Sequence, residues 1–412
     1  MRRLFVFFLF ILFVQSVSGQ RVFQAGTARI NITPETPIRM SGYGNRDNPF
    51  SGVHDSIYAT ALVFELDDQK IAMVSADVVG FSHDFVDETK IEIEKSTGIP
   101  ADKIWIIATH NHGGPITSVY MHDPSETEKE YIKTLKSKLT ATVQDAQHSL
   151  RAAKIGLGNT TCLMNINRRA RHAEGGIWLG RNPAGPCDHE VSIIRIDDLQ
   201  NQPIGAFINW PCHGTVSGQD NTQITGDWPG VTAHHFGTKT KTMVMVTAGA
   251  SADINPIYGP NNKFNDIDAI GQILADESIQ VFNHIKTSVP SSVSLEEAKL
   301  TASGKKRSDS RLPGITLEPG DDQVLRLSVL KIGSIVLAGI SGELMTEIGM
   351  QIKKESPLKN TVIVTHCNGN NGYLCTDKAY EEGGYEPMVS KTMPGTAQQI
   401  INTINELLQK LM

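Results

Sequence analysis

The sequence lacks the features that mark several common classes of protein. Its 412 residues contain five cysteines and no Cys-x-x-Cys pair, which excludes a disulfide-rich scaffold and argues against a cysteine-based zinc site. Acidic residues outnumber lysine and arginine by 44 to 38, so the basic excess typical of nucleic-acid-binding proteins is missing and we expect no nucleic-acid partner. Beyond the N-terminus, no apolar run approaches the roughly 20 residues that a membrane-spanning helix needs, so we expect no transmembrane segment in the mature chain.

The N-terminus has the pattern of a secretory signal peptide. Arg2 and Arg3 precede an apolar run from Leu4 to Val14, and small residues up to Gly19 follow. We predict removal of residues 1–19 and a secreted or periplasmic product, in which residues 20–412 form a single catalytic domain. An uncleaved membrane anchor is the alternative, although the run is short for a bilayer.

Alternating periodicities predict an α/β fold with a largely buried mixed sheet flanked by helices. β-branched and aromatic runs predict strands at residues 28–32, 59–66, 70–76, 104–108, 190–196, 203–210, 242–247, 324–330, 334–340 and 360–365. Helical spacing of apolar residues predicts helices at residues 83–96, 125–150, 228–236, 266–285, 345–355 and 392–412. Residues 165–188 are predicted as a long functional loop, and residues 291–322 as a polar excursion or small subdomain.

Polar, glycine-rich segments follow five of the predicted strands. They begin after residues 108, 210, 247, 340 and 365 and contain the side chains His110, His112, His213, Asp253, Asn255, Glu343 and Tyr373. Ligands of open α/β sheets bind outside the carboxyl ends of the strands, so we expect one active site where these segments converge. The alternative is five ordinary strand-to-helix turns, which also favour Gly, Asn and Asp.

The segment Thr-His-Asn-His-Gly-Gly-Pro at residues 109–115 resembles half of a metal site. Two histidines two residues apart point the same way on an extended chain, and the glycines let the backbone approach a ligand closely. Two imidazoles and a carboxylate are a known ligand set of catalytic zinc, which activates water for amide or ester hydrolysis. From spacing we predict that His110, His213 and Glu343 bind one zinc ion, with a polar turn bearing two surface histidines as the alternative.

Six segments, in order, resemble motifs of the neutral (non-lysosomal) ceramidases. They are His110-Asn111-His112-Gly113-Gly114-Pro115, Asn167-Arg168, His213-Gly214-Thr215, Thr225-Gly226-Asp227, Gly342-Glu343, and the pair Tyr373 and Tyr385. The first is similar to the His-x-His-Ser-Gly-Pro stretch of that family, and the third to its His-Gly-Thr segment. The resemblance covers most of the mature chain and is to the N-terminal, catalytic domain of the family.

This resemblance implies a zinc amidohydrolase with one zinc ion per chain. It implies that Tyr373 joins His110, His213 and Glu343 as a metal ligand. It also implies that three further side chains line the site and hydrogen-bond the water or polarise the scissile carbonyl, namely His112, Arg168 and Tyr385. A hydrogen-bond donor aimed at a developing oxyanion typically lowers the activation free energy by about 3 kcal/mol.

One position departs from the family pattern. Asn255 stands where the family has an active-site serine, and an amide cannot act as a nucleophile, so hydrolysis is expected to use metal-activated water. Asn255 and the neighbouring Asp253 are predicted to contact the substrate. Asp77 and Asp227 are predicted to orient ligand histidines by accepting a hydrogen bond from the ring nitrogen that does not bind the metal. A cap or turn role is the alternative.

The predicted activity is ceramidase-like cleavage of an N-acyl amide by zinc-activated water. We expect a small-molecule or lipid N-acyl substrate, with peripheral membrane contact as an accompanying expectation. Two alternatives remain open: a zinc hydrolase of a smaller polar amide, ester or lactone, and a non-catalytic binding protein that retains the metal.

Overall fold

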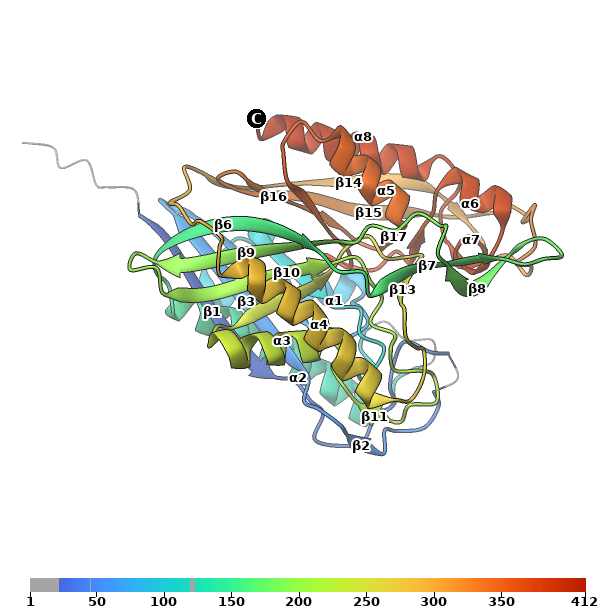
Figure 1. The fold of residues 1–412 in the computed structure, drawn as a ribbon, viewed down its shortest axis with the longest axis horizontal. Helices are drawn as coiled ribbons and strands as arrows, with labels where there is room; N and C mark the ends of the chain where they lie inside the picture. The colour runs from blue at the N-terminus through green and yellow to red at the C-terminus, as the bar shows by residue number, and fades with distance from the viewer. Residues whose placement is uncertain (1–21, 45, 119–122) are drawn as a thin grey trace, which may run out of the picture.

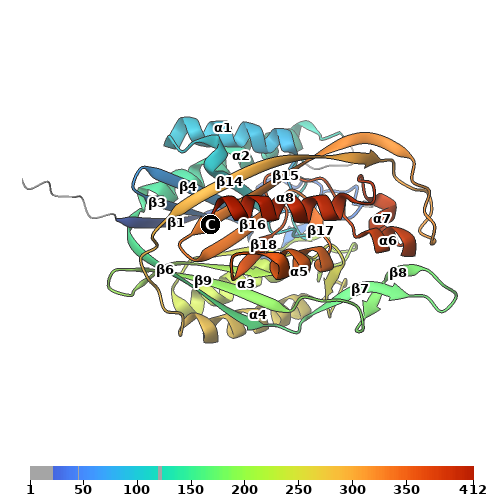
Figure 2. The same cartoon turned by 90° about the horizontal axis from the view of Figure 1, so that it is seen from above.

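A computed structural model describes residues 22–44, 46–118 and 123–412, so the predicted signal peptide lies outside the described residues. The fold has four layers, with helices outside two sheets that pack face to face (Figures 1 and 2). This confirms the predicted mixed α/β class. The expected sheet flanked by helices is in fact two sheets, each covered by helices on its outer face only.

The larger sheet has eight strands. Their order is β12 (Val244–Ala248), β10 (Pro203–Trp210), β9 (Glu190–Asp198), β6 (Arg151–Thr161), β1 (Phe23–Asn31), β3 (Tyr58–Leu66), β4 (Gln69–Ala76) and β5 (Ile104–Ala108). Its outer face is covered by α1 (His83–Thr97), α2 (Glu126–His148), α3 (Asp227–Thr240) and α4 (Phe264–Phe282). β6 was not predicted, because its alternating small and polar residues lack an apolar run.

The smaller sheet has four strands and lies on the inner face of the larger one. Its order is β14 (Val293–Lys305), β15 (Pro319–Ile332), β16 (Ile335–Ile340) and β18 (Thr361–Val364). Helices α5 (Thr346–Glu355) and α8 (Thr396–Lys410) cover its outer face, as Figure 2 shows. Side chains of both sheets, among them Phe64, Trp105 and Leu337, fill the space between them.

Local sequence explains where the first helices begin and end. The Ser82 side chain accepts a hydrogen bond from the amide of Phe85 and so caps α1, which ends at Gly98 with a φ of 73°. Helix α2 begins with a capping box, in which Ser125 and Glu128 each bind the other's backbone N–H group. These signals were visible in the sequence, and both predicted helices are confirmed within two residues.

Two segments for which no strand was predicted contain regular strands. Residues 165–188 contain the hairpin of β7 (Asn165–Arg171) and β8 (Ile177–Asn182), to which β13 (Ile254–Pro256) adds a third strand. Residues 291–322 hold β14 and the start of β15, which pair from Val293↔Ile332 to Lys305↔Pro319. The loop prediction for residues 165–188 was wrong, and the strands of residues 291–322 were missed, because pairing partners satisfy the backbone of polar strands that lack an apolar run.

Coiling of the larger sheet brings the carboxyl ends of β5, β10 and β12 close together. Through the ladder of antiparallel pairs β5 runs opposite to β10, whereas β10 and β12 are parallel. The sheet nevertheless twists far enough that Ser75 of β4 donates a hydrogen bond to Val246 of β12. The end of β18 lies beside the ends of β12 and β5. The amide of Thr365 donates to the carbonyl oxygen of Ala248, and the carbonyl oxygen of His366 accepts from the amide of Ala108.

The remaining described elements are short. They are β2 (Gly52–Val53), β11 (Gln223–Ile224), β17 (Glu343–Leu344), β19 (Tyr373–Leu374), η1 (Ala101–Lys103), α6 (Asp377–Glu382) and α7 (Tyr385–Val389). All five cysteines are unpaired. Within the described ranges, none of the helices has the length and apolarity needed to cross a bilayer.

Candidate metal centre

His110 lies two residues beyond the end of β5. Its backbone has a φ of 59°, an uncommon conformation for a residue with a side chain. Its ring Nδ1 lies 2.8 Å from the carbonyl oxygen of Val79. Because a carbonyl only accepts, Nδ1 carries a proton, which leaves Nε2 as the ring atom that can bind a metal.

His213 follows β10 and is oriented in the same way. Its Nδ1 lies 2.6 Å from the carbonyl oxygen of Ser251, in the loop after β12. The indole of Trp228 donates a hydrogen bond of 2.8 Å to the carbonyl oxygen of His213 itself. The ring is therefore held by two other segments, and its Nε2 also presents a lone pair.

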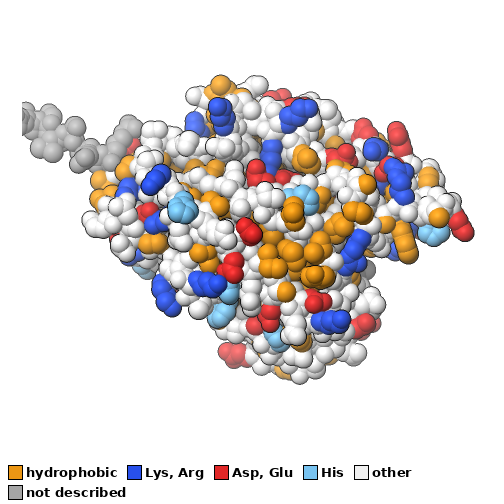
Figure 3. Space-filling view, in the orientation of Figure 1, with side chains coloured by type: hydrophobic (Ala, Val, Ile, Leu, Met, Phe, Trp, Pro, Cys, Tyr) orange, Lys and Arg blue, Asp and Glu red, His pale blue; other side chains and the backbone are white. Residues whose placement is uncertain are grey.

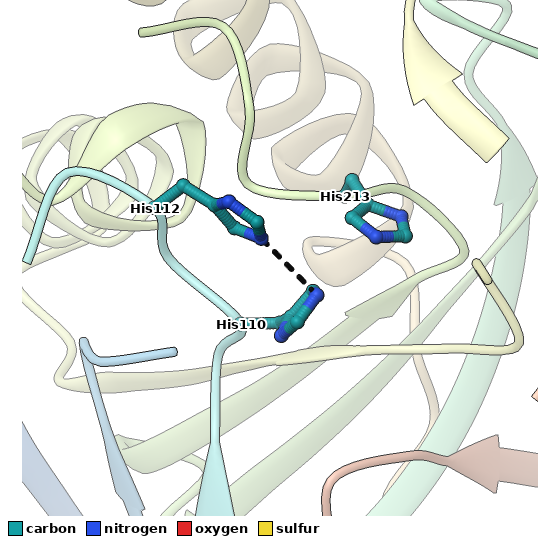
Figure 4. A group of neighbouring side chains, drawn as sticks. All are labelled: His110, His112 and His213. Carbon is teal, nitrogen blue, oxygen red and sulfur yellow. Dashed lines mark hydrogen bonds between the residues drawn. The ribbon is translucent and has the colours of Figure 1, made fainter. Parts of the chain in front are cut away.

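The three imidazoles of His110, His112 and His213 form one buried cluster. Their ligand atoms all lie within 4.8 Å of one another. Figure 4 shows the three rings facing one another from two loops, with a contact of 3.2 Å between Nε2 of His112 and Nε2 of His110. This distance is short for two lone pairs, so a proton or a cation belongs between them.

Glu343 completes the cluster from the smaller sheet. Its Oε2 lies 3.4 Å from Nε2 of His110 and 3.3 Å from Nε2 of His213. Glu343 begins β17, which pairs in parallel with β19 so that Glu343 lies opposite Tyr373. The structure thus brings together all four predicted ligands, and places His112 as close to His110 as Glu343 is.

Burial and neighbouring charges give these groups the protonation states that a cation requires. Burial lowers the pKa of His213 to about 4, and Arg168 acts in the same direction. Burial, together with His110 and His213, holds the pKa of His112 well below its usual range. Burial opposes ionisation of Glu343, but His110 and His213 outweigh it and hold the pKa of this carboxyl well below its usual range. Neutral imidazoles and an ionised carboxylate are the donor forms that bind zinc.

This donor set fits a divalent cation. Oε2 of Glu343 and Nδ1 of His112 are buried without a hydrogen-bond partner among the described residues, and unsatisfied buried polar atoms are rare. A cation bound by Nε2 of the histidines and by Oε2 would satisfy the carboxylate. The assignment of individual ligands stays a prediction, and so does the identity of the metal.

Arg168 lies in the middle of β7, and its side chain reaches the cluster from there. Its Nη2 donates to the phenol oxygen of Tyr373 at 3.1 Å, and its Nη1 donates to Oδ1 of Asn255 at 3.2 Å. On its other side, Nε donates to the buried carboxylate of Glu386 at 2.8 Å, and this carboxylate also binds Arg169 at 2.8 Å. Glu386 was not predicted, although it fixes the arginine whose Nη1 lies 3.2 Å from the ring Nε2 of His213.

A cavity of about 720 Å³ opens above the cluster. Predicted site residues that line it include His110, His112, Arg168, Asn255, Glu343, Tyr373 and Tyr385. The ring of Tyr385 meets that of Tyr373 edge to face at 5.7 Å. Burial raises the pKa of Tyr385, so its hydroxyl carries a proton at neutral pH and can donate a hydrogen bond into the cavity.

Three predicted aspartates have other partners. The carboxylate of Asp77 accepts from the amide of Tyr58, and that of Asp227 accepts from the amide of Ser217. The expectation that they orient ligand histidines is corrected, because backbone carbonyls do so. Asp253 is buried and accepts from Asn167 and from the amide of Thr346, so it holds the loop around the site and does not line the cavity.

The glycines of the histidine segment also have another purpose than expected. A Cβ at Gly113 would lie 2.6 Å from the side chain of Thr225, and a Cβ at Gly114 would lie 3.0 Å from the carbonyl oxygen of Asp77. These glycines let neighbouring loops pack closely, and do not bring backbone to the metal. Sequence reasoning also missed His366, whose ring stacks on that of His110 at 3.9 Å between centroids.

Residues 23–252 match the model of a family described as neutral/alkaline non-lysosomal ceramidase, N-terminal. The matched segment is more than half of the chain. The chain belongs to this family. The match includes the histidine cluster and Arg168, whereas Glu343, Tyr373 and Tyr385 lie beyond it and are joined to the site by the fold.

Curated ceramidases and solved structures support the family and the fold. The aligned region is 28% identical to the neutral ceramidase of Drosophila melanogaster over 246 residues, covering 55% of this chain and 34% of that protein. Neutral ceramidase 2 of Arabidopsis thaliana is 24% identical over 246 residues, covering 56% of this chain and 32% of the relative. This ceramidase-family chain thus spans about a third of the length of these relatives.

The crystal structure of neutral ceramidase from Pseudomonas aeruginosa has the same fold. Its TM-score is 0.81 at 16% identity, over 95% of this chain and 75% of that one. A structure described as ceramidase complexed with C2 gives a TM-score of 0.82 at 15% identity, with the same coverage. At this identity the likeness bears on the fold alone.

Proposed function

We propose that this protein is a zinc-dependent amidohydrolase that cleaves the amide bond of an N-acylated amine, with ceramide as the reference substrate. The observation that carries the proposal is the convergence of the imidazoles of His110, His112 and His213 with the carboxylate of Glu343 at the floor of a cavity. Its membership of the ceramidase family supports amide hydrolysis over other reactions of such a site.

The metal would be held by His110, His213 and Glu343, with Tyr373 beside them. When bound, zinc supplies a Lewis acid that polarises an acyl carbonyl and makes water nucleophilic near neutral pH. His112 lies at the cavity wall, and its Nδ1 has no hydrogen-bond partner among the described residues, so the ring can accept a hydrogen bond from an attacking water.

Arg168 and Tyr385 are placed to bind the oxygen of the scissile carbonyl. Burial works against the charge of Arg168, but Tyr373 and Glu386 raise its pKa, so the guanidinium stays charged. The Tyr385 hydroxyl has no hydrogen-bond partner among the described residues and lines the same cavity. Asn255 presents a polar amide that is held by Arg168 and orients the substrate beside it.

The proposal is tested by metal analysis of the purified protein, followed by assays with N-acyl amines that include a short-chain ceramide. We expect one zinc per chain and release of the free amine. His213→Ala should lose the metal, whereas Asn255→Ala should keep it and lose activity, because Asn255 contacts Arg168 and no histidine. A chain without stoichiometric metal, or loss of metal from the Asn255 variant, would contradict the ligand assignment.

Two alternatives have different outcomes in the same assays. Bound zinc with turnover of short polar esters or lactones and of no amide would favour the hydrolase of a smaller polar substrate. Bound zinc without turnover of any ester or amide would favour a binding protein.

We also propose that the protein is exported and that residues 1–19 are removed. The proposal rests on the pattern from Arg2 to Gly19. N-terminal sequencing of the protein from the source cells should begin near residue 20, and a chain that still carries Arg2 would contradict it.

A further inference from the structure

The cavity above the histidine cluster is lined by five arginines, which differ in how their charge is compensated. Arg39 binds the carboxylate of Glu128 at 2.7 Å, and Arg168 binds that of Glu386 at 2.8 Å. The other three are Arg46, Arg181 and Arg311. No ion pair joins any of these three to a carboxylate in the described ranges, and the residues outside those ranges include no acid.

Two of these three arginines have fixed positions. Arg46 donates to the carbonyl oxygens of Ser41, His112 and Gly218, and Arg181 donates to those of Ile257 and Gly259. Carbonyl oxygens orient a guanidinium but leave its positive charge uncompensated. Both guanidinium groups are therefore held at the cavity wall by carbonyl oxygens, and neither forms an ion pair with a carboxylate of the described residues.

Arg311 differs from these two because its guanidinium makes no hydrogen bond to the described part of the chain. Its contact is with the ring of Tyr385, at 5.4 Å from the centroid, and Tyr385 in turn meets Tyr373 beside Glu343. The backbone of Arg311 is anchored, because its carbonyl oxygen accepts from the amide of Gly384. The guanidinium thus lies two aromatic rings away from the metal cluster, with all its donors free for a ligand.

The acids of the cavity wall do not balance these charges. They are Asp47, which is exposed, and Glu343, which belongs to the metal cluster. Elsewhere the two signs are mixed, and Figure 3 shows lysine, arginine, aspartate and glutamate side chains interspersed over one face. The chain as a whole has a formal charge of -6, so an excess of arginine at one cavity is a local feature.

We propose that the preferred substrate carries an anionic group close to the scissile amide, as in an N-acyl amino acid, and that Arg311 binds this group. The proposal rests on the proposed amidohydrolase function and specifies its substrate class. Met40, Val79 and Ile116 line another part of the cavity and offer an apolar surface to the acyl chain. A guanidinium fork suits a carboxylate, which accepts two parallel hydrogen bonds.

The charge of the products favours the same class. Hydrolysis of an uncharged N-acyl amine such as ceramide releases a protonated amine, which three uncompensated guanidinium groups would repel. Hydrolysis of an N-acyl amino acid releases an amino acid whose carboxylate offsets its ammonium group. The cavity therefore disfavours a cationic product and tolerates a zwitterion.

The test compares N-hexanoylglycine with N-hexanoylglycinamide, which differ in charge alone, and includes N-acetylsphingosine as a short-chain ceramide. We expect the purified full chain to have a higher kcat/KM for hexanoylglycine than for either uncharged substrate. Arg311→Gln should lower that value about tenfold and leave hexanoylglycinamide unchanged, because it removes a charged hydrogen bond to one substrate only. Arg311→Lys should give an intermediate value, since the charge remains and the fork is lost.

Arg151→Gln is the matched control. It removes the same charge from an exposed side chain at the start of β6 that does not line the cavity, and it should leave kcat/KM for both glycine derivatives unchanged. Equal kcat/KM for the charged and uncharged glycine derivatives, a preference for the ceramide, or an equal loss on both derivatives in Arg311→Gln would overturn the proposal.

A failure of the proposed function would look different. If neither glycine derivative nor the ceramide is hydrolysed, the amidohydrolase proposal fails, and calorimetric titration with hexanoylglycine then tests the anion site by itself. Binding that Arg311→Gln weakens and Arg151→Gln does not would support the site. Binding that is absent, or equal in both variants, would overturn it.

Discussion

His110 and His213 are oriented by backbone carbonyls of Val79 and Ser251. A carbonyl leaves no trace in the residue types of a sequence, so the sequence could nominate the histidines and not the groups that aim them. The acids that it nominated for this task, Asp77 and Asp227, bind backbone amides. Residue types therefore nominated the candidate ligands, and hydrogen bonds to backbone carbonyls decided their tautomers.

Glu386 is the residue whose loss we expect to matter most outside the metal cluster. It is fully buried and its carboxylate pairs with Arg168 and Arg169. Burial opposes its charge, but the two arginines outweigh it and hold the pKa of Glu386 below its usual range. Glu386→Gln should lower the free energy of unfolding by about 3 kcal/mol, because it leaves two buried guanidinium groups short of an anion.

Urea unfolding measures this loss, and Glu382→Gln is its control. Glu382 pairs with Arg169 and Arg171 but is partly exposed, so its substitution should cost no more than about 1 kcal/mol. Equal losses in the two variants would show that the buried pair has no special role. Activity should also fall in Glu386→Gln, since Arg168 loses the partner of its Nε.

At the scale of elements, close packing of β1 against α2 depends on one glycine. A Cβ at Gly26 would lie 2.0 Å from the carbonyl oxygen of Ala146, a backbone atom of α2 that cannot move alone. Gly26→Ala should therefore lower the free energy of unfolding by about 3 kcal/mol. In β2, Gly52→Ala is the control, since its nearest neighbour would be a flexible side chain at 3.8 Å, and thermal unfolding compares the two.

Asp77, at the end of β4, should make stability depend on pH. Burial raises its pKa from 3.8 to about 6, against the effect of Arg29. Between these values the folded protein keeps a proton that the unfolded chain has lost, so this contribution is full below pH 3.8 and disappears as the pH rises through 6. The Asp77→Asn variant lacks this pH-dependent contribution. Its free energy of unfolding should therefore rise by about 3 kcal/mol relative to that of wild type as the pH increases from 4 to 7.

The measurement for Asp77 is urea unfolding of both proteins at several pH values. An exposed acid provides the control, and Asp68→Asn should follow wild type throughout. A constant difference between Asp77→Asn and wild type across this range would mean that the buried carboxyl does not retain its proton.

For the whole molecule, removal of metal should loosen the link between the two sheets. The cluster joins loops of the larger sheet to Glu343 beside the smaller one. A ligand that binds only the folded state stabilises it by about 4 kcal/mol at 1,000 times its dissociation constant. We expect a chelator to lower the melting temperature and far-UV circular dichroism to be retained below it, because four hydrophobic clusters hold the layers independently.

His213→Ala provides the control for this effect. Its melting temperature should already be low and should not respond to the chelator. A melting temperature of wild type that does not change with chelation would argue against a tightly bound metal.

The outer end of the β7–β8 hairpin bears exposed Trp178 and Leu179, beside the cavity that Leu179 lines. Figure 3 shows hydrophobic side chains mixed with charges of both signs at that end of the molecule. Such a surface is compatible with the expected peripheral membrane contact, which stays a prediction.

The sequence by itself determined the α/β class, most strands and helices, and the candidates His110, His213 and Glu343, because periodicity and short spacings are local. Arg168 and Tyr385 entered through family resemblance alone, and so did the role of Tyr373 as a metal ligand. Only the tertiary structure decided that two sheets face each other, that Asp253 lies behind the site, and that Glu386 holds Arg168 across 218 positions of the chain. Long-range pairing and burial depend on how the sheet coils, and no local pattern encodes that.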